Sequence, residues 1–279
     1  MSNSNFNINE DYLTGRLISL RRGVALQVCY HHGSSTPLIF LHGGLGNRFN
    51  WRYQYEFFAT QGRTVLAYDL GGHGQSTSYP RYSIGRHGRD LTLLLDNFLI
   101  QSPVLCCHSY GVPIGLEWAR RYPVKGLVLV AGGTHDLAPW WEIPLIKALK
   151  WGGRYLYYLP LVQFFTDWFS SSHSSETIKQ FFAESPVPKD FDSYKALEIF
   201  WQYNFFRKSK PKFADNIPVL VISGGRDLMF SREMGDVLAN HFKLGEHLHL
   251  ASGGHLLIAE YPEMINTAIA EWLTKCEKI

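Results

Sequence analysis

The 279-residue sequence has little of what marks several common protein classes. It contains only four cysteines, Cys29, Cys106, Cys107 and Cys276, and their spacing matches neither a disulfide framework nor paired zinc ligands. No tract of lysine and arginine stands out and the formal net charge is only +3, so nothing indicates nucleic-acid binding. No window approaches the roughly 18 apolar residues that a membrane-spanning helix needs.

The first ten residues also lack the basic start and apolar core of a secretory signal. Together with the absence of a disulfide framework, this favours a reducing, cytoplasmic location. Hydrophobic residues make up 46% and charged residues 18% of the chain, a composition typical of an ordinary globular protein and not of a disordered one. The length fits one large α/β domain with an insertion, or two domains.

Short apolar runs alternate with helical patterns along most of the chain. Strands are predicted at 17–20, 24–31, 37–41, 64–68, 104–107, 127–130, 219–222 and 247–250, and helices at 52–61, 85–101, 111–122, 231–243 and at a final segment ending near 275. The first two strands form a hairpin, and the later runs are apolar on both faces. The pattern predicts an α/β fold with a mostly parallel twisted sheet of about eight strands and helices on both faces.

The rhythm is interrupted between residues 134 and 207. About a quarter of these residues are aromatic, against 15% of the whole chain, and they contain no buried strand pattern. We interpret 134–207 as a helical lid or cap on a core formed by 1–133 and 208–279. The tryptophans and basic residues near 140–154 could contact a lipid surface peripherally, but a solvated face of the lid is the favoured alternative.

One strand-to-helix turn carries the clearest chemical signal. The segment Cys107-His108-Ser109-Tyr110-Gly111 follows a buried strand and precedes a helix, which places Ser109 on the turn between them. A side chain on such a turn projects above the edge of the sheet, and free N–H groups at the start of the helix can hold developing negative charge. The pattern G-x-S-x-G is matched except that cysteine replaces the first glycine.

Two further polar residues follow predicted strands at the same edge. A serine hydroxyl becomes nucleophilic when a histidine takes its proton and a carboxylate orients that histidine. Ser109, Asp227 and His255 each come shortly after a predicted strand, and loops at the carboxyl ends of parallel strands meet in one crevice. The three side chains are therefore expected to converge as a catalytic triad.

Several other residues near these turns have alternative interpretations. Asp69 and Asp136 also follow strands, but Asp136 lies beyond two glycines. The thiol of Cys107 should point into the core. The ring of Tyr110 is expected to pack. Buried histidines that bond loop backbone are the favoured interpretation of His42 and His108, and His247 and His249 are expected on the surface of a strand. No metal site is expected.

The motifs together resemble those of a known superfamily. The segments His42-Gly43-Gly44, 69–76, 108–111, 224–227 and 253–256, in the order serine, aspartate, histidine, are similar to those of α/β-hydrolase fold proteins, in particular the abhydrolase-domain, esterase-like branch. The resemblance covers nearly the whole chain from Leu17, apart from the insertion. It implies Ser109 as nucleophile, His255 as general base and Asp227 as its orienting carboxylate. It also makes the turn at Asp69 structural, with the carboxylate or hydrogen-bonded glycines holding the loop. No cofactor is expected.

The same resemblance implies an oxyanion hole made by the backbone N–H groups of Tyr110 and Gly44, with Leu45 as the alternative to Gly44. Members that open epoxides or remove halides are expected to carry aspartate at the position of Ser109, so neither activity is expected.

We therefore expect a serine hydrolase that cleaves carboxylic esters of small apolar or aromatic acyl substrates through an acyl-enzyme. Hydrolysis of a carbon–carbon bond, amide, lactone or thioester by the same triad remains open, as does a ligand-sensing protein with little turnover. Leu45, Trp141, Trp201 and Tyr203 are expected to contact the substrate. The sequence does not distinguish a monomer from a homodimer.

Overall fold

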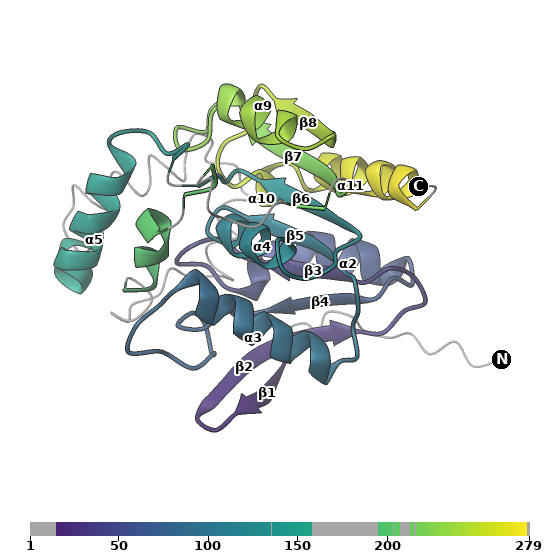
Figure 1. Ribbon diagram of the computed structural model, residues 1–279, viewed down its shortest axis with the longest axis horizontal. Helices are drawn as coiled ribbons and strands as arrows, with labels where there is room; N and C mark the ends of the chain where they lie inside the picture. The colour runs from purple at the N-terminus through teal and green to yellow at the C-terminus, as the bar shows by residue number, and fades with distance from the viewer. Residues whose placement is uncertain are drawn as a thin grey trace.

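The computed structural model describes residues 15–134, 136–157, 195–202, 204–206, 213–214 and 216–277. Its strands are β1 (Arg16–Arg21), β2 (Val24–His31), β3 (Leu38–Leu41), β4 (Val65–Tyr68), β5 (Val104–His108), β6 (Gly126–Val130), β7 (Pro218–Gly224) and β8 (Leu244–Leu250). They form a single eight-stranded sheet in the order β1-β2-β4-β3-β5-β6-β7-β8 (Figure 1). The β1–β2 and β2–β4 pairs are antiparallel and all other pairs are parallel, which confirms the predicted hairpin and mostly parallel sheet.

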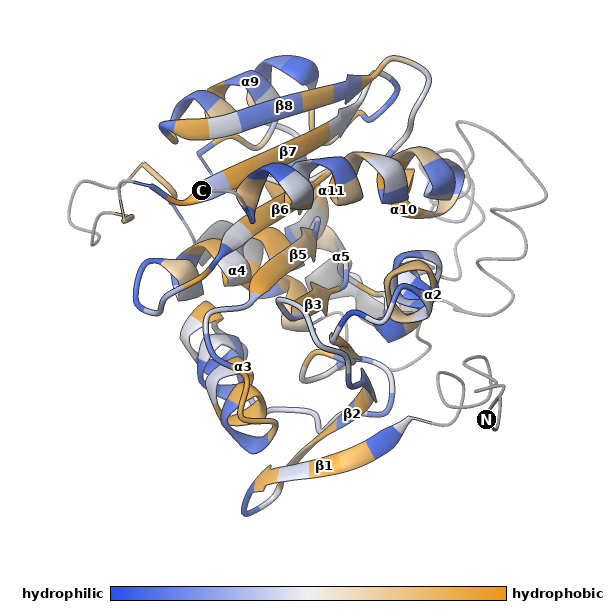
Figure 2. Cartoon of the chain, turned by 90° about the vertical axis from the view of Figure 1, so that its right-hand side faces the viewer, coloured by the Kyte–Doolittle hydropathy of each residue, from blue (hydrophilic) through white to orange (hydrophobic). Residues whose placement is uncertain are grey.

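Helices cover both faces of this sheet. The helices of the described residues are η1 (Arg48–Trp51), α2 (Arg52–Thr60), α3 (Ile84–Asn97), α4 (Gly111–Ala119), α5 (Glu142–Tyr157), η2 (Leu197–Gln202), α9 (Arg232–Asn240), α10 (Leu257–Glu260) and α11 (Pro262–Cys276). One face packs against α2 and α11, and the other against α3, α4 and α9. Figure 2 shows the apolar central strands between these two layers. The helix predicted at 85–101 ends earlier because Leu99 adopts a φ of 55°, outside the helical range.

Alternate residues of the central strands belong to opposite layers of the core. Cys106 lies in the cluster formed with α2 and α11, whereas Cys107 lies in the cluster formed with α3 and α4, and both are fully buried. Burying one valine- or leucine-sized side chain contributes about 1.5–3 kcal/mol, so a sheet packed on both faces is held rigidly. The loops at its carboxyl edge therefore start from fixed positions.

The predicted cap is described only at its two ends. Helix α5 stands outside both helical layers, beyond the end of the sheet (Figure 1). The carboxylate of Asp136 accepts hydrogen bonds from the backbone N–H groups of Phe205 and Phe206, at 2.9 and 2.7 Å, and from the hydroxyl of Thr134. The start of the insertion is thus tied to its end. Residues 158–194 lie outside the described residues, and the division into core and cap stays a prediction.

In the described part of the chain, no helix combines the length and the apolar character needed to cross a membrane.

Candidate active site

The turn that follows β5 holds Ser109 in an uncommon backbone conformation. Its φ is 46°, in the left-handed region that non-glycine residues rarely enter. The neighbouring loop leaves room for it, because a Cβ added to Gly132 would lie 2.7 Å from the Cα of Ser109. Helix α4 starts two residues later at Gly111, where an added Cβ would lie 2.7 Å from the carbonyl oxygen of Leu41. The turn therefore needs small residues both after the serine and opposite it.

Cysteine at position 107 is accommodated by a glycine on the helix behind it. A Cβ added to Gly115 would lie only 2.4 Å from the Sγ of Cys107. The side chain of Cys107 therefore occupies space that would be empty if glycine stood at position 107. The absence of a side chain at Gly115, on α4, makes room for its sulfur. Burial raises the pKa of the Cys107 thiol well above its usual value, so this group stays protonated and unreactive, in agreement with its predicted place in the core.

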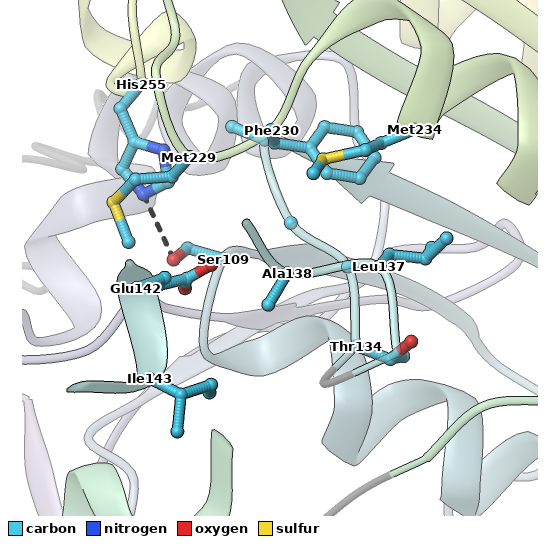
Figure 3. Close-up of a pocket in the computed structure, with 13 residues that line it drawn as sticks. Ser109, Thr134, Leu137, Ala138, Glu142, Ile143, Met229, Phe230, Met234 and His255 are labelled. Atoms are coloured by element: carbon cyan, nitrogen blue, oxygen red, sulfur yellow. Dashed lines mark hydrogen bonds between the residues drawn. The ribbon is translucent and has the colours of Figure 1, made fainter. Parts of the chain in front are cut away.

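Ser109, His255 and Asp227 converge at the carboxyl edge of the sheet. The Nε2 of His255 lies 3.0 Å from the Oγ of Ser109, and its Nδ1 lies 2.9 Å from the Oδ2 of Asp227 (Figure 3 shows the first contact). The other carboxylate oxygen, Oδ1, accepts from the backbone N–H groups of Met229 and Phe230 at 2.8 and 3.2 Å. These bonds fix the carboxylate, which in turn selects the histidine tautomer with its proton on Nδ1 and leaves Nε2 to accept from the serine.

The electrostatic surroundings favour a protonated His255. Burial by itself would lower the pKa of His255, but the charge of Asp227 and its hydrogen bond more than offset this, and the pKa lies above the ordinary 6.5. The side chain of Asp227 has no exposed surface, whereas that of His255 is 19% exposed. The arrangement can therefore take a proton from Ser109 and stabilise the resulting imidazolium.

The two residues named for the oxyanion hole lie side by side. A Cβ added to Gly44 would lie 3.5 Å from the Cβ of Tyr110. The ring of Tyr110 is fully buried, and its hydroxyl donates to the carbonyl of Ala196 at 3.0 Å. The ring thus packs as expected and joins the serine turn to the end of the insertion, a contact that no sequence pattern predicts.

His42 and His108 support the backbone of the surrounding loops. One ring nitrogen of His42 bonds the carbonyl of Gly43 at 2.7 Å, and the other accepts from the N–H of Leu70 at 2.9 Å. The Nε2 of His108 donates to the carbonyl of His255 at 2.9 Å. Burial lowers the pKa of both rings to about 3, so both are neutral at ordinary pH and neither competes with His255 as a base.

The two rival carboxylates are occupied elsewhere. Asp69 accepts from the guanidinium and the backbone N–H of Arg48, at 2.8 and 2.9 Å, and from the N–H of Gln75 at 2.9 Å. It therefore fixes its own glycine-rich turn against the loop that carries Gly44. Asp136 bonds the backbone at the end of the insertion, as described above.

A pocket beside Ser109 and His255 has an apolar wall and one carboxyl group. Leu137, Ala138, Ile143, Met229, Phe230 and Met234 form most of the wall (Figure 3). Glu142, the first residue of α5, also lines this pocket, and no sequence pattern predicted it as a site residue. The enclosed volume is about 20 Å³, which is room for about one water molecule.

The residues expected to contact substrate are not among the described residues of this wall. Leu45 packs against the hydrophobic core, with a φ of 59° that its turn requires, and Trp141 is half-buried next to Glu142. The side chain of Trp201 and the whole of Tyr203 lie outside the described residues. Their contacts with substrate stay predictions.

A second serine, histidine and aspartate are arranged similarly, but their serine is sealed from solvent. The Oγ of Ser223 lies 2.7 Å from the Nε2 of His247 and 2.9 Å from the Nδ1 of His249. The Nδ1 of His247 in turn lies 2.7 Å from the Oδ1 of Asp236. Ser223 has no exposed surface, so no substrate can reach it. The side chain of His247 is only 8% exposed, and the expected surface position is wrong for it because α9 covers the strand.

Among the described residues, no group of three or more histidine, cysteine, aspartate or glutamate side chains is arranged to hold a metal ion.

Comparison with known proteins adds three findings. A family model described as alpha/beta hydrolase fold matches residues 36–262. Protein ABHD8 from Mus musculus is 24% identical over 271 residues, covering 88% of this chain and 56% of that protein, so the chain spans about half the length of the ABHD8 relatives it matches. The (E)-2-((N-methylformamido)methylene)succinate hydrolase from Acinetobacter baylyi is 26% identical, covering 88% of this chain and 92% of that protein.

Among solved structures, the esterase EaEST from Exiguobacterium antarcticum superposes with a TM-score of 0.79 at 17% identity, covering 93% of this chain and 99% of that one. At this level of identity the likeness shows a shared fold.

Proposed function

Because the chain belongs to the alpha/beta hydrolase fold family, we propose that it is a serine hydrolase that cleaves carboxylic esters of small apolar or aromatic acyl compounds through an acyl-enzyme. The observation that carries this proposal is the continuous hydrogen-bonded relay from Ser109 through His255 to Asp227, with separations of 3.0 and 2.9 Å. The apolar wall of the pocket supports an apolar substrate.

Each group has a defined part in the reaction. The Oγ of Ser109 attacks the ester carbonyl carbon while its proton passes to the Nε2 of His255, and Asp227 stabilises the imidazolium. The carbonyl oxygen becomes an oxyanion, which the N–H groups of Gly44 and Tyr110 bind. When the tetrahedral intermediate collapses, His255 gives its proton to the departing alcohol. A water molecule, deprotonated by His255, then cleaves the acyl-enzyme, and the acid leaves.

The first turn of α5 acts as part of a lid in this proposal. Because the pocket volume of about 20 Å³ holds about one water molecule, this proposal has α5 or the loops beside it move when an acyl group binds. Trp140, just before this helix, and Trp151, within it, are 87% and 92% exposed, and they are the side chains through which peripheral contact with a lipid surface would occur. Sedimentation with phospholipid vesicles tests that contact.

Labelling with a fluorophosphonate probe tests the nucleophile and its activation together. We expect a single covalent adduct on Ser109, located by peptide mass spectrometry, and no adduct in Ser109→Ala. The same variant should lose turnover of short aryl esters while its unfolding curve is retained. Turnover that persists in Ser109→Ala would contradict the proposal.

A panel of esters, thioesters, lactones, amides and diketones then separates the possible bonds, because the relay activates the serine alike for each. Turnover of about 1 s⁻¹ or faster on any of them lies in the ordinary enzyme range and distinguishes catalysis from ligand sensing.

A further inference from the structure

Glu142 introduces a carboxyl group into a pocket that is otherwise apolar. It is the first residue of α5 and only 7% exposed. It lines the same pocket as Ser109 and His255, and Figure 3 shows its carboxyl end directed toward Ser109. An approaching acyl group therefore meets this carboxyl next to the carbon that Ser109 attacks.

The charges around Glu142 are few and come from the proposed relay. Among the described residues that line the pocket, only Glu142 and His255 titrate at ordinary pH, and no lysine or arginine is present. Burial raises the pKa of Glu142 to about 7. The charge of His255 opposes this rise, and the charge of Asp227 adds to it. The carboxyl thus changes from neutral to negative near neutral pH, with a neutral or protonated His255 as its nearest titratable partner in the pocket.

We propose that Glu142 sets the charge preference of the substrate, so that the pocket accepts uncharged esters and rejects esters that carry a carboxylate close to the reacting carbonyl. This inference rests on the proposed function. A second negative charge in the pocket would meet an ionised Glu142 in a site of low dielectric, where like charges repel strongly. Apart from His255, which belongs to the proposed relay, no described lining residue offers a positive side chain.

The inference separates this chain from one of its relatives. The relative from Acinetobacter baylyi is named for a succinate derivative, which bears carboxylates. A pocket lined by Glu142 is a poor match for such a compound. The difference in charge preference would therefore arise at the first turn of the insertion, outside the serine, histidine and aspartate to which we assign the catalytic relay.

The test compares two esters of equal length, ethyl butanoate and monoethyl succinate, by ethanol release at pH 5.5 and 8.5. The ratio of their kcat/KM values is measured for the wild type, Glu142→Gln and the control Glu271→Gln. Glu271 is exposed on α11, in the helical layer that α11 forms with α2. Its replacement by glutamine removes the same charge as Glu142→Gln. Protonation of His255 lowers kcat/KM for both esters alike. Its effect therefore cancels in the ratio of the two kcat/KM values measured on one enzyme at one pH.

We expect the wild type to prefer ethyl butanoate at least about tenfold at pH 8.5 and less at pH 5.5, where Glu142 is protonated. Glu142→Gln should abolish most of this preference at pH 8.5, and Glu271→Gln should keep it. An unchanged ratio in Glu142→Gln would overturn the inference, whereas the proposed function would stand as long as ethyl butanoate is turned over and Ser109→Ala is inactive. If Glu142→Gln does not fold, Glu142→Ala replaces it.

A binding measurement covers the case in which neither ester is hydrolysed. Dissociation constants of butanamide and succinamate are measured by NMR titration of Ser109→Ala, with and without Glu142→Gln. Tighter binding of succinamate, by about tenfold relative to butanamide, once Glu142 is replaced would support the charge preference although the proposed hydrolysis had failed. Equal effects on both ligands, or binding of neither, would overturn the inference as well.

Discussion

The contact between Cys107 and Gly115 gives the sharpest prediction about the serine turn. Replacing Gly115 with alanine places a methyl carbon 2.4 Å from the Sγ of Cys107, well inside the roughly 3.5–4 Å of an ordinary contact. Both residues are buried between β5 and α4, so neither can move into solvent. Gly115→Ala should therefore force the serine turn and the helix apart.

The size of the effect follows from two opposing contributions. Overpacking of this kind costs about 1–3 kcal/mol of unfolding free energy. Alanine is also favoured over glycine inside a helix by about 1 kcal/mol. Gly115→Ala alone should therefore lower the unfolding free energy by up to about 2 kcal/mol.

The sign should reverse when the sulfur is absent. In Cys107→Ala, the atoms nearest the new methyl carbon would be the Cβ of residue 107 at 3.7 Å and the Cδ1 of Leu105 at 3.9 Å, which are ordinary contacts. Only the helix preference then remains, and Gly115→Ala should stabilise that background by up to about 1 kcal/mol.

The assay is a double-mutant cycle measured by urea unfolding of the wild type, both single variants and the double variant. The fluorophosphonate-reactive fraction of each variant reports whether the serine turn is displaced. If Gly115→Ala costs the same in both backgrounds to within about 0.5 kcal/mol, the overlap is not what requires glycine at this position, and our explanation of the departure from G-x-S-x-G is wrong.

Four further predictions follow from the site. Asp227→Asn should lower kcat on an aryl ester by about 10⁴, because asparagine does not hold His255 in the required tautomer, and a loss below tenfold would contradict the relay. The value of kcat/KM should fall as pH drops through the pKa of His255, which lies above 6.5, and Glu142→Gln should move this midpoint to lower pH because a nearby carboxylate no longer favours the imidazolium. The pKa of Glu142 is raised from 4.5 to about 7, so its protonated form stabilises the fold below pH 4.5, and that contribution is lost as pH rises through about 7. Glu142→Gln should therefore raise the unfolding free energy by up to about 3 kcal/mol at pH 8.5 and leave it unchanged at pH 4. Urea unfolding at both pH values measures this difference. Asp69→Asn should cost about 3–5 kcal/mol in the same measurement, because the buried guanidinium of Arg48 loses its carboxylate, and a cost below 1 kcal/mol would show that the pair is not required.

The chemistry of the site was visible in the sequence because it is attached to local patterns. Ser109, Asp227 and His255 each follow a strand, and parallel strands present their carboxyl ends at one edge. Their mutual geometry in the structure agrees with that placement, although their catalytic roles stay predictions. Asp69 and His42 also follow strands. Asp69 was assigned to the support of its turn by the resemblance to the superfamily, and His42 because buried histidines commonly bond loop backbone.

The pocket wall could not be predicted in this way. Trp141 was expected to contact substrate, yet among the described residues it is the adjacent Glu142 that lines the pocket. Which side of a helix at the start of an insertion faces the serine depends on how that helix docks, and the sequence of α5 carries no local signal for this. The two serine–histidine–aspartate groups also differ through tertiary packing, since Ser223 has no exposed surface in a strand that packs against α9, whereas Ser109 lines a pocket.

The sequence by itself determined the order of strands and helices, the covered sheet and the three polar residues at its edge, because periodicity, glycine-rich turns and residue chemistry are local properties. Only the tertiary structure decided that Gly115 makes room for Cys107, that Glu142 stands beside Ser109 and that His247 is enclosed. These are contacts between elements remote in the chain, and they depend on how side chains fill a shared space.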